Sequence, residues 1–477
     1  MNNARESKLQ GKRTKKNKKD KKGNNDTSDD IKEMELPDDF SIFGGGSTIT
    51  SFGEDDSYLD EFDNDDRGDD DAAEQRAATR FSKLQDALSL AATLPSEKRS
   101  IKREGIYRVL FKAITNYAAS PEMLESHWTN LLEACLFSIQ GKGNAKPSEQ
   151  YAACRVLEAS AVVLGEDQDE IVEQLNDQLK RIVNATGKAA QVRCAALRCL
   201  AMVHFICGTD CLEEGEDCAS VMDLCEKVAA EKYRGEEVSP LLRATGLDCW
   251  SLLSTTFHDA TVAAGDGYDD DLGRGLQLLP LLASCLDSEG SDYAGLRRSA
   301  GECVSLIHEA RLNLGLDEEE AENATERKFR RGSWDGSEWE VLMDEVKQRI
   351  AELSVESSHY MSKQAKKQQK STFRDFNNTI VDDEAPEEVV NWKGGQLNLN
   401  SWKEIVQLNF VRHCLQGGFQ IQLMTNETLH SVFGATFHAS GTSLSQLEKR
   451  LYMSKTSEAA KSADKARTKQ RRTRTNV

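Results

Sequence analysis

Apolar residues recur at helical spacing through the middle of the chain, between about residues 100 and 315. Ile106, Leu110 and Ile114 share one helix face, and Ser120-Pro121 begins a second run that ends near Gly141. Apolar positions three and four apart predict amphipathic helices, and Pro and Gly mark where they begin and end. Further helices are predicted over residues 151–164, 171–183, 192–207, 221–233, 241–257, 272–286 and 293–314.

Four of these segments carry a related motif, in which small residues are followed by a charged residue, then Cys or Ala, then an apolar run. Aligned on Leu157, Leu197, Leu247 and Gly301, the motifs lie 40, 50 and 54 residues apart. Armadillo and HEAT repeats have a period of about 40–47 residues, with insertions placed in loops. The chain is therefore predicted to be all-α, with an armadillo- or HEAT-like solenoid that binds partners along its surface and seldom carries chemistry.

The pattern changes from residue 326 onward. Basic residues lead into an aromatic run at 366–375, alternating apolar residues follow at 396–402, and a helical pattern spans 402–412. A mixed apolar series covers residues 419–434. This succession predicts a small, mostly helical C-terminal domain.

Two runs make this segment specific, KKQQKSTFRD at residues 366–375 and NETLHSVF at residues 426–433. They resemble the C-terminal domain of the interferon-related developmental regulator family, which follows a helical-repeat domain in the same order, over roughly residues 80–436. The resemblance implies a non-catalytic regulator, because members are described as transcriptional co-regulators working through deacetylase-containing complexes and as ribosome-bound repressors of translation. In the ribosome-bound form, it implies a helical domain near the tRNA sites of the small subunit and a C-terminal helix in the mRNA channel.

Four regions are predicted on these grounds. Residues 1–78 are predicted to be a disordered basic-then-acidic tail, and residues 79–325 an armadillo-like helical repeat domain. Residues 326–439 are predicted to form a C-terminal domain of the family type, and residues 440–477 a basic C-terminal helix or tail.

The formal net charge of −19 conceals a segregated distribution. Residues 1–22 hold ten Lys/Arg against two acidic residues, and residues 442–477 hold ten against three. Residues 54–74 hold twelve Asp/Glu against Arg67 alone. Blocks of like charge repel themselves and stay unfolded until a partner neutralises them. Solvated tails without a specific partner are the alternative to nucleic-acid contact or nuclear import.

The basic C-terminal tail and a second basic strip at the start of the C-terminal domain are the candidate RNA contacts. Cations on a mobile tail release condensed counterions when they neutralise phosphates, so binding would depend strongly on salt. Phe373 and Phe376 lie near the strip, but they fit core positions better than base-stacking positions. The candidate RNA- or ribosome-binding residues are Lys363, Lys366, Lys367, Lys370, Arg374, Lys449, Arg450, Lys455, Lys461, Lys465, Arg467, Lys469, Arg471, Arg472 and Arg474.

The basic N-terminal block suggests a nuclear import signal. A protein present in both cytoplasm and nucleus is therefore expected, and the acidic run could mask the basic strips or bind basic ribosomal or histone tails. The candidate import residues are Lys12, Arg13, Lys15, Lys16, Lys18, Lys19, Lys21 and Lys22.

Sequence signals for catalysis, metal and membrane are weak. The eight histidines form no H-E-x-x-H pair, and no nucleophile elbow, dinucleotide fingerprint or kinase signature is found. The Cys207, Cys211, Cys218 and Cys225 spacing lacks the paired C-x2-C units of zinc sites, and buried thiols explain the cysteines. No secretory apolar region and no run of 18 apolar residues is present. We therefore predict no enzyme activity, metal, cofactor, membrane contact or small-molecule substrate.

The favoured interpretation is a non-catalytic scaffold that binds ribosomes or RNA to repress or regulate translation. The alternative is a nuclear transcriptional co-regulator that binds chromatin-associated protein complexes through its helical repeats. Expected partners are thus the ribosome and its rRNA, and proteins along the solenoid.

Overall fold

The computed structural model describes residues 82–116, 121–208, 215–263, 273–316, 338–355, 363–392 and 395–434, which belong to one compact unit. The predicted tails at 1–78 and 440–477 lie wholly outside these ranges, and so does the predicted boundary at 325/326. Their predicted boundaries therefore stay predictions.

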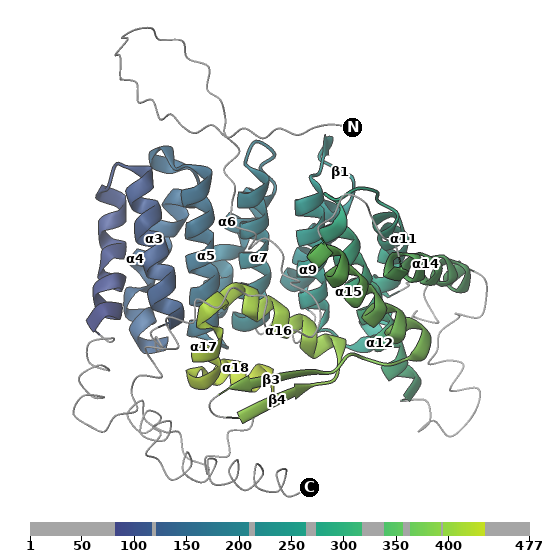
Figure 1. Cartoon of the computed structure of the whole chain (residues 1–477). Helices are drawn as coiled ribbons and strands as arrows, with labels where there is room; N and C mark the ends of the chain where they lie inside the picture. The colour runs from purple at the N-terminus through teal and green to yellow at the C-terminus, as the bar shows by residue number, and fades with distance from the viewer. Residues whose placement is uncertain are drawn as a thin grey trace, which may run out of the picture. The chain divides into compact units, whose positions relative to one another are not determined.

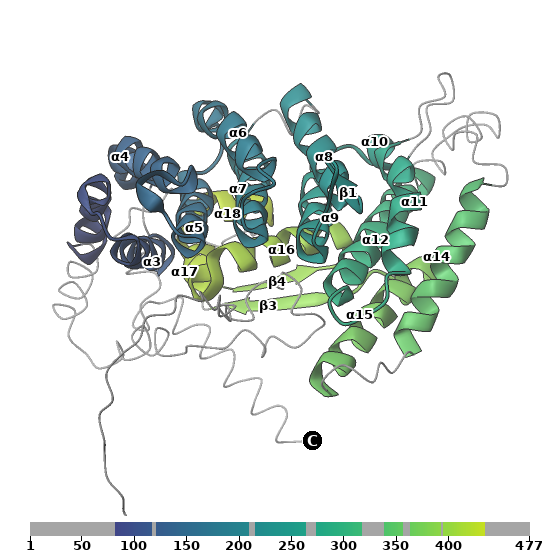
Figure 2. The same cartoon turned by 90° about the horizontal axis from the view of Figure 1, so that it is seen from above.

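Antiparallel helices form two stacked layers, which Figure 2 shows from above. The inner layer consists of α3 (Ser100–Asn116), α5 (Pro147–Leu164), α7 (Ala190–Cys207), α9 (Pro240–Ser254) and α12 (Ala294–Leu316). Each inner helix contacts the next one along the series. The outer layer consists of α4 (Pro121–Ile139), α6 (Asp169–Val183), α8 (Glu216–Ala229) and α11 (Arg274–Leu286), with the short α10 (Asp259–Ala263) between α9 and α11. The predicted all-α helical-repeat solenoid is confirmed.

A repeated arginine explains why the inner helices share a motif. The fourth residue of α7, α9 and α12 is Arg193, Arg243 or Arg297, and its guanidinium donates to a carbonyl at or just after the end of the preceding outer helix. The acceptors are Val183 O at 2.8 Å, Ala229 O at 2.8 Å and Ser288 O at 2.6 Å, respectively. The last carbonyls of a helix have no partner within it, so each arginine satisfies an otherwise unpaired acceptor.

A comparison of where the inner helices begin corrects the register predicted for the first motif. The four helices begin at Pro147, Ala190, Pro240 and Ala294, which lie 43, 50 and 54 residues apart. The first offset is therefore 43 and not 40, and the alignment on Leu157 was three residues out. In α5 the fourth position holds a glutamine, so no arginine was available to fix the register from sequence.

One predicted helix ends earlier than its apolar pattern suggested. Residues 232–233 pair with residues 236–237 as the β1–β2 hairpin, with Tyr233 opposite Glu236. The turn residues Arg234 and Gly235 have φ values of 53° and 82°. Two consecutive positive φ angles match the tight turns that suit the twist of a hairpin, so α8 ends at Ala229 and not at Tyr233.

The C-terminal segment first continues the two layers and then crosses them. Helix α14 (Glu338–Val355) packs on α11, and α15 (Lys363–Asp382) packs on α12. The chain then forms the β3–β4 hairpin (Glu388–Trp392 and Gly395–Leu399), α16 (Trp402–Leu415), η4 (Gln416–Gly418), α17 (Phe419–Thr425) and α18 (Glu427–Val432). Figures 1 and 2 show these last elements lying along the inner layer. The segment is mostly helical, as predicted, and the alternation at residues 396–402 corresponds largely to β4.

The hydrophobic core runs without interruption from the first repeats into the C-terminal segment. By length and composition α7 could cross a membrane, but 83% of it is buried inside the protein, as a core helix would be. Shared burial means that the described parts of the two predicted domains stabilise one another.

Candidate functional site

Helix α16 crosses the inner layer, and side chains of two inner helices cap its ends. At its N-terminus, Glu309 of α12 accepts hydrogen bonds from the backbone N–H groups of Trp402 at 2.6 Å and Lys403 at 3.1 Å. Burial raises the pKa of Glu309, and these two backbone donors oppose that shift. A carboxylate at the positive end of a helix dipole is the favourable arrangement.

At the C-terminus of α16, Arg155 of α5 has the complementary role. Its guanidinium donates to His413 O at 2.7 Å and to Cys414 O at 2.9 Å, and it also pairs with Glu158. A cation at the negative end of the helix stabilises it. Helix α16 is therefore fixed in register between α12 and α5.

The C-terminal segment caps helices of the repeat domain in return. The Gln422 amide donates to Ile114 O at 3.1 Å and Thr115 O at 3.0 Å, near the end of α3. The Asn426 amide donates to Val162 O at 2.8 Å, near the end of α5. Because these carbonyls have no partners within their own helices, the segment completes the repeat domain.

Below this segment lies a row of buried charges. The ninth residue of α5, α7, α9 and α12 is Arg155, Arg198, Asp248 and Glu302, respectively, and each is at most 5% exposed. Burial raises the pKa of Asp248 to about 6, although Arg198 and a hydrogen bond from Ser299 lower it. Two basic residues followed by two acidic residues therefore mark the inner face that the C-terminal segment covers.

The buried histidine and thiols of this region are poor nucleophiles and bases. Burial, with Arg198 and Arg155 nearby, holds the pKa of His413 well below its usual range, so its imidazole is neutral. Burial raises the pKa of the Cys154 and Cys207 thiols to about 12, so both stay protonated. Ten cysteines of the described ranges are free and buried, and no group of three possible metal ligands occurs among the residues described.

Helix α15 carries the predicted basic strip, and two buried phenylalanines anchor this helix in the core. Phe373 and Phe376 are each 1% exposed, so the prediction that they are core residues is confirmed. The ring of Phe376 lies 5.3 Å from that of Trp402, and Gly301 of α12 leaves room for it. Arg374 between the two phenylalanines is exposed.

The other predicted contact residues are only partly located. Lys370 is half-buried, and Lys363, Lys366 and Lys367 lie in the first turns of α15. Along the helix, Lys363, Lys367, Lys370 and Arg374 follow the 4-3-4 spacing of one face. The candidates at residues 449–474 and the import residues at 12–22 lie outside the described part of the chain.

The capping residues Glu309, Gln422 and Asn426 were not identified from the sequence, because their partners are more than 90 positions away. One local signal was available at the start of α16. Ser401 Oγ accepts from Glu404 N at 3.2 Å, while Glu404 accepts from Asn400 N at 2.9 Å. This capping box resembles the Ser-x-x-Glu signature of a helix start.

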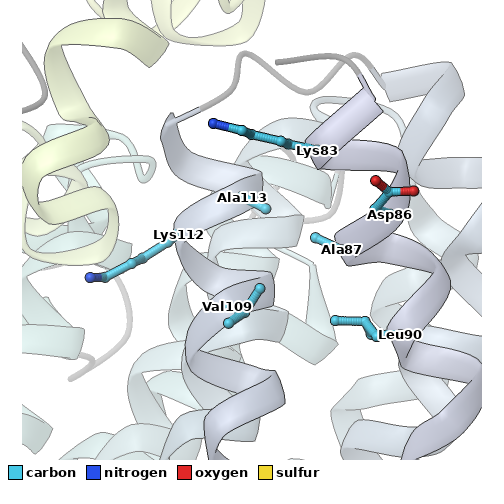
Figure 3. A pocket seen from close by; sticks show the side chains of 7 residues that line it. All are labelled: Lys83, Asp86, Ala87, Leu90, Val109, Lys112 and Ala113. Carbon is cyan, nitrogen blue, oxygen red and sulfur yellow. The ribbon is translucent and has the colours of Figure 1, made fainter. Parts of the chain in front are cut away.

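A shallow groove of about 420 Å³ lies between the helical residues 82–96, which precede the first repeat, and α3 (Figure 3). The side chains of Leu90 and Val109 face each other across it, and its floor is mainly apolar. It is lined by Lys83, Asp86, Ala87, Leu90, Val109, Lys112 and Ala113. Such a lining offers few convergent polar groups, and by itself points to no chemistry.

Comparison with known proteins gives a consistent result. The family model of the interferon-related developmental regulators matches residues 47–381, which is more than half of the chain. Interferon-related developmental regulator 1 of Mus musculus is 25% identical over 415 residues, covering 83% of this chain and 81% of that protein. The human protein of the same name is 25% identical with the same coverage, and regulator 2 of Mus musculus is 24% identical over 80% of this chain and 81% of its own length.

The family match includes the run at residues 366–375 and ends within α15, before the run at residues 426–433. It thus spans the helical repeats and the basic helix that packs on them. The chain belongs to the interferon-related developmental regulator family.

Proposed function

We propose that the protein is a non-catalytic regulatory scaffold that binds ribosomes through their RNA and thereby represses or otherwise regulates translation. The proposal is supported mainly by the basic stripe of α15, which is held on a helix whose opposite face is anchored by Phe373 and Phe376. Membership of a regulatory family agrees with a binding role. Where the C-terminal segment meets the repeats, His413 is buried and neutral, and the Cys154 thiol is buried and protonated.

Two sets of cations are proposed to contact the RNA, one on α15 and one in the tail at 442–477. The buried Phe373 and Phe376 anchor α15 on the repeats, so the backbone that carries the exposed Arg374 is already ordered before binding. The tail at 442–477, which lies outside the described residues, carries ten Lys/Arg. Each phosphate that is neutralised releases counterions, so both sets favour a polyanionic partner such as rRNA.

Sucrose-gradient sedimentation of the intact chain with ribosomes, at two salt concentrations and with or without RNase, tests the proposal. Deleting residues 442–477 should remove most of the association. Deleting residues 1–22 is a matched control, since it also removes ten Lys/Arg. Full, salt-insensitive binding by the chain without residues 442–477 would count against the proposal.

The role of the α15 stripe needs a separate variant. Replacing Lys363, Lys367 and Arg374 by Gln should weaken co-sedimentation, while thermal unfolding should be unchanged because Arg374 is exposed. Unaltered sedimentation of this variant would restrict the proposed contact to the tail.

The nuclear co-regulator remains the alternative, because residues 12–22 carry a basic block typical of import signals. With the inner layer covered by its own C-terminal segment, protein partners would meet the outer layer. This alternative predicts nuclear accumulation that is lost when Lys12–Lys22 are changed to Gln, and chromatin-factor partners that resist nuclease treatment.

A further inference from the structure

Three successive loops form one edge of the two layers. They join outer to inner helices and comprise residues 97–102, 140–146 and 181–189, including the adjoining helix ends. The first two loops touch where Lys146 N donates to Ser100 Oγ at 3.2 Å. The third stretch contacts the end of α4, directly before the second stretch, where Lys188 Nζ donates to Ile139 O at 2.8 Å. The β1–β2 hairpin, labelled β1 in Figure 1, lies on the same edge, since Tyr233 donates to Asn184 at 2.7 Å.

The three stretches, called the basic rim below, are strongly positive, whereas the neighbouring hairpin carries both signs, with Lys232 and Arg234 beside the exposed Glu236 and Glu237. Within the three stretches the single acidic residue is Glu97, which is half-buried and pairs with Lys102. Lys188 is committed to capping α4, so it is not counted among the contacts. The exposed cations are Lys98, Arg99, Lys102, Lys142, Lys146 and Arg181.

The helix dipole favours Arg181, which lies in the last turn of α6, but it does not favour Lys98, Arg99, Lys102 and Lys146, which lie next to helix starts. Helices α3, α5 and α7 begin there, and cations near a helix N-terminus are disfavoured by the dipole. The first turns of α3 and α7 contain no acidic residue, and the one in α5, Glu149, is buried and paired with Arg103. The helices that begin at the opposite edge follow the usual rule, because α6 starts with Asp169 and Glu170.

The composition of the rim distinguishes between kinds of polyanion. The three stretches contain no aromatic residue, and Tyr233 of the neighbouring hairpin is half-buried and bonded to Asn184. Protein interfaces, in contrast, are enriched in aromatic anchors, and single-stranded RNA sites use aromatic rings for stacking. Between the cations lie small exposed residues such as Gly143, Asn144 and Gly187. Small neighbours allow a broad, rigid surface to approach the lysine and arginine groups closely.

We propose that the basic rim binds the phosphate backbone of double-stranded RNA, without reading its bases. The inference rests on the proposed function, because it adds a fixed RNA contact to a protein already assigned to a ribosomal partner. It goes beyond that function by naming a surface remote in sequence from α15 and from the basic tail.

Binding of the intact chain to a fluorescent RNA duplex of about 20 base pairs, measured by polarisation across a salt series, tests the inference. In the variant Lys142→Gln/Lys146→Gln, each lost phosphate contact should reduce the salt slope by about 1, with weaker binding to every duplex sequence. The matched control is Lys83→Gln/Lys227→Gln, which removes two exposed cations elsewhere on the described surface. Thermal unfolding of both variants should match that of the parent.

The results separate the rim from the proposed function. A rim variant whose slope and affinity equal those of the control would overturn the inference, even if the tail deletion still abolishes ribosome association. Rim-dependent duplex binding without any ribosome co-sedimentation would support the rim and remove the translational proposal. The inference would also be overturned if the rim variant lost single-stranded RNA binding more than duplex binding. The same holds if an acidic peptide of residues 54–74 competed for the rim more strongly than unlabelled duplex, when both are compared at equal concentrations of negative charge.

Discussion

The carboxylate of Glu309 lies 2.6 Å from the backbone nitrogen of Trp402 and accepts its hydrogen bond, which ties the last inner helix of the repeats to the first turn of α16. At the other end of α16, Arg155 makes the corresponding contact with two carbonyls. Two charged side chains on separate repeats thus set the position of one crossing helix. The C-terminal segment therefore belongs to the same structural unit as the solenoid that it covers.

Removing the carboxylate should loosen the start of α16. Glu309→Ala removes two charge-assisted hydrogen bonds to Trp402 N and Lys403 N, so unfolding should become about 1–2 kcal/mol easier. Glu309→Gln keeps one acceptor oxygen and should lose less. Urea denaturation gives the free energies, and hydrogen exchange at the two amides locates the effect. Equal losses in both variants would contradict a capping role.

The buried pair of Arg155 and Glu158 should show strong coupling. Arg155→Met leaves the fully buried Glu158 without its cation, which should cost about 3–5 kcal/mol. Arg155→Met/Glu158→Met removes both charges and should be less destabilised than the single variant. A double-mutant cycle from denaturant unfolding measures the coupling, and strictly additive losses would refute the prediction.

Gly301 should not tolerate a methyl group. A Cβ at this position would lie 2.6 Å from the ring of Phe376, so Gly301→Ala should destabilise the protein by about 1–3 kcal/mol through overpacking. Gly105→Ala is the control, because nothing lies within 4 Å of its Cβ position and alanine favours helix. That control should be stabilised by about 0.5–1 kcal/mol. Thermal or urea unfolding showing the same sign for both variants would disprove the close contact.

Asp248 should make stability depend on pH. Its pKa is raised from 3.8 to about 6, so the folded protein holds this proton more tightly than the unfolded chain. Its contribution is therefore greatest at low pH and is lost as the pH rises through 6. Asp248→Asn cannot ionise and retains an acceptor for Ser299, so its stability relative to the parent should increase by roughly 2 kcal/mol between pH 4.5 and 7.

Urea denaturation of both proteins across this pH range tests the sign. Neighbouring charges also bear on the result, because Arg198 and Arg298 lower the pKa of Asp248. Burial and the nearby Asp248 also raise the pKa of Glu302. A stability difference that stays constant with pH would show that Asp248 does not titrate in this range.

Much of the helical architecture was predictable because its signals are local. The apolar spacing gave α5, α6 and α7 with ends within a few residues, and Phe373 and Phe376 were correctly assigned to the core. The end of α8 was missed, because Tyr233 fits an apolar helix pattern as well as it fits a hairpin. The motif register failed at α5, where glutamine stands at the position of Arg193 and Arg243.

Of the two candidate RNA-binding surfaces in the described residues, one is visible in the sequence and the other is not. Clusters of lysine and arginine at residues 366–374 are visible in one stretch of sequence, whereas the basic rim draws its cations from three stretches. Nothing in the sequence shows that Lys146 meets Ser100, since their pairing depends on how successive repeats stack.

By itself the sequence determined an all-helical repeat protein with charged ends, because helix periodicity and charge blocks are properties of neighbouring residues. Only the tertiary structure decided that α16 lies across the repeats between Glu309 and Arg155, and that buried charges line the face below it. Unpaired groups at helix ends must find partners, and only the folded chain determines which distant side chains reach them.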